Sequence, residues 1–259
     1  MYLIIGGDST IGQTLSKYWE ENSIQHIVTT RNFRSINESR LYLDLMDENL
    51  PDFTKHQFNA VIFCAACTSL DYCKTNPKIS RQINVDATIK LASLFNKYNS
   101  HLIFLSSNQV FDGLKPFRKT CDLTCPVSEY GRQKVLAENY FRKISNTAVL
   151  RLTKVIHHNI PLLQHWETKL KADEFIEAFV NVYISPITLE NVILNINDIV
   201  KFHKSGIFHL SGLKDISYYD FAKNYFEFIP NSKFLIKKTF FNGVENNINS
   251  NNFYSTLSM

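Results

Sequence analysis

The chain opens with Tyr2-Leu3-Ile4-Ile5-Gly6-Gly7-Asp8-Ser9-Thr10-Ile11-Gly12, a short apolar run that leads into a glycine-rich turn. A helical pattern over Thr10–Glu21 follows, so the turn lies between a predicted strand and a predicted helix. Three of the chain's eight glycines fall in these first twelve residues, which indicates a backbone requirement. This order is the one that a dinucleotide-binding loop needs, because the amino end of the helix offers N–H groups and a positive dipole to a pyrophosphate.

Each residue of the turn has an expected part. Gly6 allows the tight turn, and Gly12 lets the helix pack closely on the sheet. Ser9 stands where a middle glycine is common, so its hydroxyl either bonds phosphate or caps the helix. The expected contacts to the cofactor in this loop are Gly6, Ser9, Thr10, Ile11 and Gly12.

The first half of the chain alternates between apolar runs and helical patterns, which predicts an α/β fold with a doubly wound, parallel sheet of the Rossmann type. The expected strands are Tyr2–Ile5, Ile24–Thr30, Leu41–Leu43, Ala60–Ala65, His101–Ser106 and Thr147–Leu152, and the expected helices are Thr10–Glu21, Pro77–Tyr98 and Pro126–Ile144.

The alternation weakens after residue 153. We expect a Rossmann domain over 1–153 that binds NADP, and over 154–259 mainly a smaller C-terminal substrate lobe, with some segments returning to the Rossmann domain. The patterns there predict helices at Lys171–Val180, Leu189–Phe202 and Tyr218–Phe228, a strand at Ile207–Leu210, and little periodicity from Pro230 onward.

Composition excludes several classes of protein. With 44% hydrophobic residues the chain is too apolar to be disordered, and no apolar run approaches the roughly 18 residues of a membrane span. The net charge of +4 is spread along the chain, which disfavours nucleic acid and suits an anionic small molecule. The start has no basic region typical of a signal peptide, so we expect a cytoplasmic protein without membrane insertion. The sequence is compatible with a homodimer.

Five cysteines is an odd number, which favours reduced thiols over a disulfide framework. Cys64 and Cys67, with Cys121 and Cys125, have a spacing that zinc could use. Cys64 and Cys67, however, flank the end of an apolar run, where small buried residues are usual, so we expect no metal site.

Arg31 follows the second predicted strand, at the point where NAD-binding proteins usually carry an acidic residue for the ribose 2′-hydroxyl. A guanidinium there suits a 2′-phosphate, so the sequence favours NADPH over NADH. The alternative is a solvated arginine.

Tyr130 and Lys134 are four residues apart, so on a helix they share one face. Tyr130 can donate a proton to a carbonyl that accepts hydride, while Lys134 lowers the tyrosine pKa and contacts the nicotinamide ribose. Ser107, at the end of a predicted strand, can hold the same carbonyl oxygen. Tyr219 and Lys223 have the same spacing, but they lie beyond the alternating region, where a structural helix is expected.

The ordered series of motifs resembles the extended short-chain dehydrogenase/reductases, and within them the dTDP-4-dehydrorhamnose reductase-like group. Besides the glycine turn and the Tyr130–Lys134 motif, the series comprises Tyr42-Leu43-Asp44-Leu45, Val61 to Cys73, Ile83-Asn84-Val85, Leu105 to Gly113, Leu150-Arg151, and Phe208-His209-Leu210-Ser211-Gly212 with Ser217 to Ala222.

The resemblance implies that Ser107, Tyr130 and Lys134 are the catalytic triad. It implies further cofactor contacts from Asp44 and Leu45 beside the adenine, and from Ala65, Ala66 and Cys67 along the cofactor. It implies a nucleotide-activated sugar with a 4-keto group as substrate, near Asn108 and under the second lobe.

The chain departs from the family pattern at several positions. Ser107 replaces a threonine and keeps the hydroxyl, whereas Asn108 replaces an aspartate and removes a charge. Lys154 stands where a substrate-stacking tryptophan is usual, so its ammonium either meets the substrate or is solvated. The family's closing helix after a motif like 252–259 has no counterpart in the sequence.

We therefore expect an NADPH-dependent reductase of a 4-keto nucleotide sugar in polysaccharide biosynthesis. The first alternative is a non-catalytic, NADP-binding regulatory subunit with the same fold, as in the β subunit of methionine adenosyltransferase. The second alternative is a nucleotide-sugar epimerase or dehydratase, which the absence of a carboxylate at Asn108-Gln109 disfavours.

Overall fold

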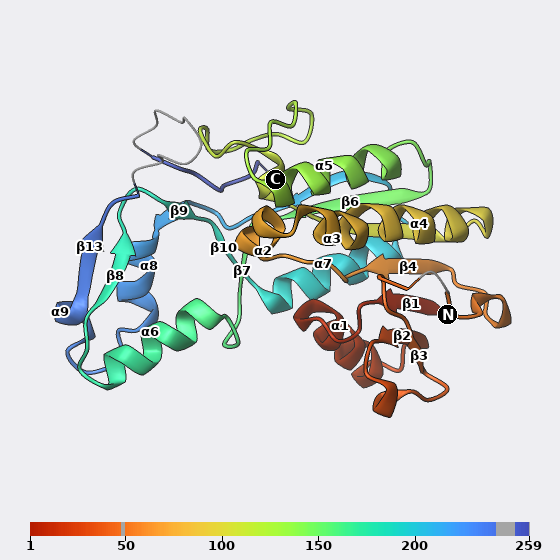
Figure 1. Cartoon of the computed structure of the whole chain (residues 1–259), viewed down its shortest axis with the longest axis horizontal. Coiled ribbons are helices and arrows are strands. Elements are labelled where there is room, and N and C mark those ends of the chain that lie inside the picture. The colour runs from red at the N-terminus through yellow and green to blue at the C-terminus, as the bar shows by residue number, and fades with distance from the viewer. Residues whose placement is uncertain (48–49, 242–251, 259) are drawn as a thin grey trace. The chain divides into compact units, whose positions relative to one another are not determined.

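The computed structural model describes residues 1–47, 50–241 and 252–258 (Figure 1). The chain divides into two compact units, each discontinuous in sequence. The first unit comprises Met1–Phe111, Leu123–Leu152 and Leu189–His209, and the second comprises Asp112–Asp122, Thr153–Thr188 and Leu210–Met259. In the part of the chain that the structure describes, no helix is long and apolar enough to cross a membrane.

The first unit is built on a seven-stranded sheet, which confirms the predicted fold class. In spatial order the strands are β11 (Gly206–Leu210), β6 (Thr147–Leu152), β5 (His101–Ser107), β4 (Ala60–Phe63), β1 (Tyr2–Ile5), β2 (His26–Thr30) and β3 (Arg40–Tyr42). The pairs from β3 to β6 are parallel, and Ile5 lies opposite Phe63 where β1 meets β4. Strand order reverses between β1 and β4, so a crevice for a ligand is expected at the carboxyl ends of these strands.

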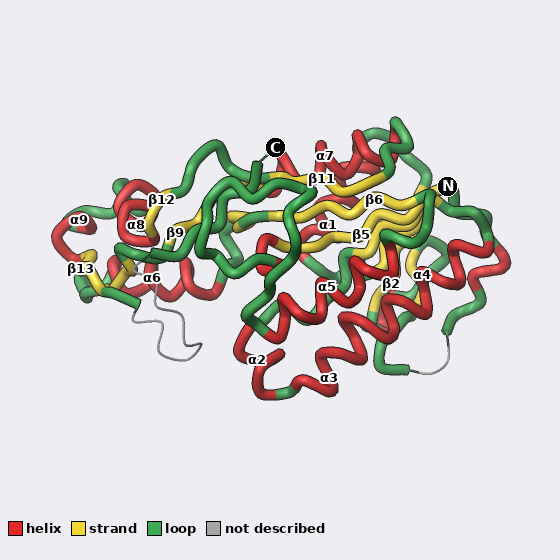
Figure 2. The backbone as a smooth tube through the Cα atoms, turned by 90° about the horizontal axis from the view of Figure 1, so that it is seen from above, coloured by secondary structure: helices red, strands yellow, loops and turns green. Residues whose placement is uncertain are grey.

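Helices cover both faces of this sheet. They are α1 (Thr10–Glu21) and α7 (Leu189–Lys201), which contact each other, and α2 (Leu70–Thr75), α3 (Pro77–Arg81), α4 (Thr88–Lys97) and α5 (Glu129–Phe141). Figure 2 shows α4 and α5 on one side of the strands and α7 on the other. Buried residues of α4 and α5, such as Phe95 and Phe141, form one hydrophobic core with residues of the sheet such as Leu3.

The helix predicted over 77–98 is interrupted. Between α3 and α4 the segment Gln82–Ala87 is a π-helix, a wider turn that is frequent at functional sites. Short 3₁₀ turns occur at Phe33–Ser35, Phe53–Lys55 and Asn108–Val110.

The described residues of the second unit form three two-stranded sheets and three helices. β7 (Lys154–Ile156) pairs with β10 (Pro186–Thr188), β9 (Tyr183–Ile184) with β12 (Ile216–Ser217), and β8 (Ile176–Phe179) with β13 (Ile236–Thr239). The helices are α6 (Pro161–Lys171), α8 (Tyr218–Tyr225) and α9 (Ser232–Leu235). Trp166, Phe221 and Phe226 belong to a separate hydrophobic core in this unit.

One helix predicted in the second half of the chain is wrong. Lys171–Val180 is not a helix, because α6 ends at Lys171, Asp173 turns the chain with a φ of 56°, and β8 begins at Ile176. The tail from Pro230, for which the sequence shows little periodicity, contains the short elements α9 and β13. Residues 242–251 and 259 of that tail lie outside the described residues.

Candidate active site and cofactor pocket

The glycine turn after β1 makes close backbone contacts that only glycine allows. Gly6 has a φ of +90°, and a Cβ atom there would lie 2.5 Å from the backbone nitrogen of Ala65. The Gly6 N–H donates to Oγ1 of Thr29 at 2.8 Å, which ties the turn to β2. The sequence therefore needs Gly6 for both its backbone conformation and its contact with the end of β4.

Ser9 and Gly12 act within the turn itself. The Ser9 hydroxyl accepts from the N–H of Gly12 at 3.1 Å and donates to the carbonyl oxygen of Gly6 at 2.8 Å, so Ser9 caps α1. A Cβ atom on Gly12 would collide with the same Gly6 carbonyl oxygen. Gly12 thus lets α1 approach the turn, whereas we predicted an approach to the sheet.

A cavity of about 440 Å³ opens at the carboxyl ends of β1, β2 and β4, where the strand order reverses. Eight of the predicted cofactor residues line it: Gly6, Ser9, Arg31, Asp44, Leu45, Ala65, Ala66 and Cys67. Thr10, Ile11 and Gly12 form the first turn of α1 behind this lining. The cavity size, the glycine contacts and the adjacent helix terminus fit a dinucleotide.

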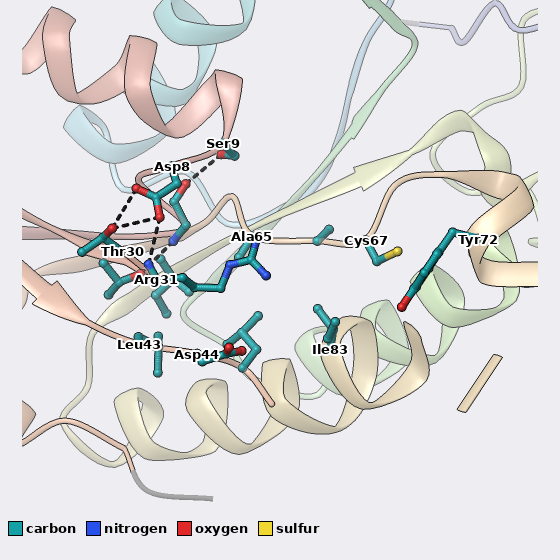
Figure 3. A pocket seen from close by; sticks show the side chains of 15 residues that line it. Asp8, Ser9, Thr30, Arg31, Leu43, Asp44, Ala65, Cys67, Tyr72 and Ile83 are labelled. Carbon is teal, nitrogen blue, oxygen red and sulfur yellow. Dashed lines mark hydrogen bonds between the residues drawn. The ribbon is translucent and has the colours of Figure 1, made fainter. Parts of the chain in front are cut away.

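Charged side chains meet at the β2 end of the cavity. The Asp8 carboxylate accepts from the Thr30 hydroxyl at 2.9 Å and from the N–H of Arg31 at 2.9 Å. An Arg40 guanidinium nitrogen lies 3.6 Å from an oxygen of Asp8. Figure 3 shows the Arg31 side chain extending into the cavity, while Asp8 turns toward Thr30. This end therefore presents a guanidinium to a ligand beside a carboxylate that already has partners.

The structure brings Ser107, Tyr130 and Lys134 together in the first unit. Ser107 ends β5, and the other two lie in the first half of α5. The Tyr130 hydroxyl forms a hydrogen bond with Ser107, and the Lys134 ammonium lies 5.7 Å from the centroid of the tyrosine ring. Nζ of Lys134 donates to the carbonyl oxygen of Leu105 at 2.8 Å, so the lysine is fixed to β5 as well. The nearby thiols of Cys73 and Cys67 act to raise the pKa of Tyr130, and Cys67 lines the cavity.

The pKa values of this group differ from the expectation. Burial raises the pKa of Tyr130 well above its usual value, and this effect outweighs the hydrogen bond with Ser107. Burial lowers the pKa of Lys134 to about 8, although the carboxylate of Glu138 acts in the opposite direction. We predicted that Lys134 lowers the pKa of Tyr130, but desolvation dominates for both groups.

Gly131 sets the distance between α5 and the end of β5. A Cβ atom there would collide with the carbonyl oxygen of Gln109, in the 3₁₀ turn that follows Ser107. A glycine in the Tyr130–Lys134 motif thus allows the helix that carries Tyr130 to touch the segment that carries Ser107. Its position beside the tyrosine could have indicated this contact in the sequence.

Asn84 is a residue of the site that sequence reasoning missed. It lies in the π-helical segment, is almost fully buried, and accepts from the N–H of Cys67 at 2.8 Å while it donates to the Cys67 carbonyl oxygen at 2.9 Å. Its amide also donates to Gln133 of α5 at 2.8 Å. Asn84 thus joins the wall of the cavity to the helix of Tyr130.

Glu138 and Arg151 are a second missed pair. Two hydrogen bonds of 3.0 and 2.7 Å join the Arg151 guanidinium to the Glu138 carboxylate, and both side chains are 1% exposed. The Ser106 hydroxyl donates to the same carboxylate at 2.5 Å. Glu138 lies four residues after Lys134, so a repeat of the Tyr130–Lys134 spacing was the available signal.

The remaining predicted residues divide between the two units. Asn108 follows Ser107 and accepts from its hydroxyl at 3.4 Å. Lys154 lies in β7 of the second unit, where burial lowers its pKa. Tyr219 and Lys223, the second pair with the same spacing, lie in α8, and Tyr219 packs on the core of the second unit. Among the described residues, no cluster of three or more potential ligands could hold a metal ion.

Comparison with known protein families gives one matching family model, the RmlD substrate binding domain, over residues 1–245. A probable low-salt glycan biosynthesis reductase of Haloferax volcanii is 26% identical over 212 residues, which cover 79% of this chain and 68% of the relative. The methionine adenosyltransferase 2 subunit beta of Pongo abelii is 29% identical over 153 residues, 58% of this chain, but the match spans only 45% of that relative.

Solved structures with the same fold cover nearly the whole chain. A hypothetical dTDP-4-dehydrorhamnose reductase from Sulfolobus tokodaii superposes with a TM-score of 0.80 at 25% identity, over 100% of this chain and 92% of that one. A dTDP-4-dehydrorhamnose reductase from Bacillus anthracis, solved in complex with NADP, has a TM-score of 0.84 at 18% identity, over 99% and 88%.

Proposed function

The chain belongs to the RmlD substrate binding domain family, whose members include NAD(P)-dependent reductases, and from this premise we propose that it is an NADPH-dependent reductase of a 4-keto nucleotide-activated sugar. The observation that carries this proposal is the convergence of Ser107, Tyr130 and Lys134 in the first unit, where Tyr130 interacts with Cys67 of the cavity wall.

The cavity supports NADPH as the cofactor. Its wall carries the glycine contacts and the guanidinium of Arg31, and the Bacillus anthracis relative was solved with NADP. When bound, this cofactor supplies the hydride. Arg31 would hold the 2′-phosphate, and Asp44 with Leu45 would lie beside the adenine.

The reaction then needs a proton at the carbonyl oxygen. Ser107 hydrogen-bonds this oxygen and orients it, and Tyr130 donates its phenolic proton as the oxygen becomes an alkoxide. A raised pKa keeps Tyr130 protonated at neutral pH, which a proton donor requires. Lys134, held by Leu105, places a positive charge beside the phenolate that remains. Asn108 and Lys154 are proposed to contact the sugar nucleotide, and the reaction is proposed to be cytoplasmic, as the odd number of cysteines favours.

The experiment follows the oxidation of NADPH by the loss of its absorbance, with a panel of 4-keto sugar nucleotides as substrates. The wild type is compared with the variants Tyr130→Phe and Tyr219→Phe. We expect turnover with at least one substrate, a loss of about 100-fold or more in Tyr130→Phe, and no loss in Tyr219→Phe, which has the same spacing to a lysine. NADPH binding without turnover on the whole panel would contradict the proposal.

The second candidate is a non-catalytic, NADP-binding regulatory subunit. The similarity to methionine adenosyltransferase 2 subunit beta, which covers 58% of this chain, favours it. Stoichiometric NADPH binding that Tyr130→Phe leaves unchanged, with no turnover by either protein, is the result expected of such a subunit. An epimerase or dehydratase would instead convert a sugar nucleotide without net oxidation of NADPH.

A further inference from the structure

Two cysteines are in contact at the edge of the cofactor cavity. Cys67 is the last of the three cavity residues that follow β4, and Cys73 lies in α2. Their sulfur atoms are 3.9 Å apart, and the Cys73 thiol is 3.5 Å from the carbonyl oxygen of Cys67. Figure 3 shows Cys67 beside Tyr72, at the end of the cavity remote from Asp8. The reaction proposed above uses neither thiol.

We propose that Cys67 and Cys73 are a redox-active dithiol, in which hydrogen peroxide oxidises Cys67 and Cys73 then closes a disulfide. The distance supports this pairing, because the two sulfur atoms are 3.9 Å apart, about 2 Å beyond the bond length of about 2.05 Å. The loop closed by the bond is short and already structured, so little chain has to be ordered.

The surroundings of the two thiols assign their roles. Cys67 is half-buried and lines the cavity, so a small oxidant can reach it, whereas Cys73 is fully buried. Burial raises the pKa of the Cys73 thiol to about 11, which makes Cys73 a poor first nucleophile. Cys67 is therefore the attacking thiol, and Cys73 is the resolving thiol.

The chemistry balances in two steps. The Cys67 thiol attacks one oxygen of the peroxide, the O–O bond breaks, and the products are a sulfenic acid on Cys67 and one water. The Cys73 thiol then attacks the Cys67 sulfur, the S–O bond breaks, and a second water leaves with the proton from Cys73. Two thiols lose two electrons in total, and one peroxide gains them.

The backbone around Cys67 is held in place for this step. Asn84 bonds both the N–H and the carbonyl oxygen of Cys67, and its amide nitrogen lies 3.9 Å from the Cys73 sulfur. Cys64, the third cysteine in this region, is a different case, because burial raises the pKa of its thiol to about 12 beside Lys134. Cys64 is therefore expected to stay reduced.

A consequence for the cofactor follows, and this part rests on the proposed function. Cys67 lines the cavity assigned to NADPH, so the bound cofactor should cover its sulfur. NADPH at ten times its Kd leaves about a tenth of the protein unliganded, so oxidation of Cys67 should slow about tenfold. The Cys67–Cys73 disulfide would therefore form mainly in protein molecules that have no NADPH bound.

The experiment treats the full-length protein with hydrogen peroxide and analyses the tryptic peptide 56–74, which contains all three cysteines. We expect a mass lower by two hydrogens in the wild type and in Cys64→Ala. In Cys73→Ala the cross-link should be absent, and a dimedone adduct should form on Cys67 instead. Cys73→Ser is the second variant in case the alanine variant does not fold, which a thermal melt monitors.

Three outcomes would overturn the proposal. The cross-link could vanish in Cys64→Ala, it could persist in Cys73→Ala, or wild-type Cys67 could proceed to a sulfinic acid without any cross-link. The effect of NADPH on oxidation is tested separately. If the cross-link forms equally fast with and without saturating NADPH, in protein shown to bind NADPH, then only the protection of Cys67 by the cofactor is refuted. A protein that forms the cross-link but binds no NADPH refutes the proposed function and leaves the dithiol standing.

Discussion

Arg31 and Asp8 place opposite charges at one end of the cofactor cavity. A bare carboxylate there would repel a 2′-phosphate, but Asp8 accepts bonds from the Thr30 hydroxyl and the Arg31 N–H and lies 3.6 Å from Arg40. These partners offset much of its charge. The Arg31 guanidinium itself remains directed into the cavity (Figure 3). At the residue scale, the proposed preference for NADPH over NADH therefore rests mainly on Arg31.

We expect Arg31→Ala to raise the Kd for NADPH about tenfold or more and to change the Kd for NADH less than about threefold. A charge-assisted hydrogen bond contributes about 1.5–3 kcal/mol, and only the 2′-phosphate would lose it. Fluorescence titration with both nucleotides measures the two constants. Arg34→Ala is the control, because Arg34 is exposed and follows Arg31 by three residues. Equal affinity of the wild type for NADH and NADPH would contradict the assignment.

At the scale of elements, α5 is the helix on which the candidate chemistry depends. It carries Tyr130, Lys134 and Glu138 at four-residue intervals, so all three share one face. Glu138 holds Ser106 and Arg151, Lys134 holds the carbonyl oxygen of Leu105, and Gly131 touches Gln109. The helix is thus fixed to β5 along its length, with Ser107 beside Tyr130.

Gly131→Ala should disturb this fit. The added methyl group would collide with the backbone carbonyl of Gln109, which cannot swing away as a side chain can. We expect a loss of about 1–3 kcal/mol in the free energy of unfolding and, if the proposed reaction is correct, a loss of activity of about tenfold or more. Urea unfolding and NADPH oxidation measure the two effects. Arg132→Ala, at the exposed next position, should change neither; equal losses in both variants would show that the close contact has no special part.

Lys134 should also make stability depend on pH. Its pKa is about 8 in the folded chain and 10.5 in the unfolded chain. Between these pH values the unfolded chain binds the proton and the folded chain does not, so the free energy of unfolding rises with pH. The cost of burying the charge is full below pH 8 and is lost by pH 10.5, a change of about 3 kcal/mol.

Urea unfolding of the wild type and Lys134→Met at pH 7, 8, 9 and 10 isolates this effect, because the other titrating groups cancel in the difference. We expect the wild type to gain stability relative to the variant as the pH rises from 8. Lys97→Met, at an exposed position of α4, should give a flat difference. A flat difference for Lys134→Met as well would mean that the buried ammonium titrates as it does in water.

The elements of the first unit could be predicted from the sequence because its strands are buried on both faces and appear as continuous apolar runs. The strands of the second unit could not, because they have only two to four residues, too few to reveal a period, whereas the helix predicted over Tyr218–Phe228 corresponds to α8. Ile176 and Ala178 are buried while Glu177 is exposed, a strand pattern that a helical assignment over 171–180 obscured. In the candidate site, the glycines and the tyrosine–lysine spacing could be recognised in the sequence. The hydrogen bonds of Asn84 could not be predicted, because they join segments far apart in sequence and leave no local pattern.

At the scale of the whole molecule, the chain leaves the first unit and returns to it. After β6 it contributes residues 153–188 to the second unit, and then α7 and β11 complete the first. α7 and β11 are integral parts of the first unit. Nε1 of Trp19, a fully buried side chain of α1, donates to Asn197 of α7 at 3.1 Å, and β11 is the neighbour of β6 in the sheet. A boundary at residue 153 would thus cut through the core of the first unit.

A fragment of residues 1–153 should therefore fail to fold, whereas residues 1–210, which retain α7 and β11, should show a cooperative transition. Without α7 the shorter fragment exposes the surface that Val192, Ile196 and Val200 cover, and without β11 it exposes β6 as an unprotected edge. Circular dichroism during thermal unfolding compares the two fragments with the full chain, and size-exclusion chromatography detects aggregation. Because five side chains of α7 are buried, we expect the difference between the fragments to amount to most of the stability of the unit. A sigmoidal transition with the same midpoint in both fragments would mean that residues 154–210 contribute nothing to the stability of the first unit. The sheet would then be stable with six strands, without β11.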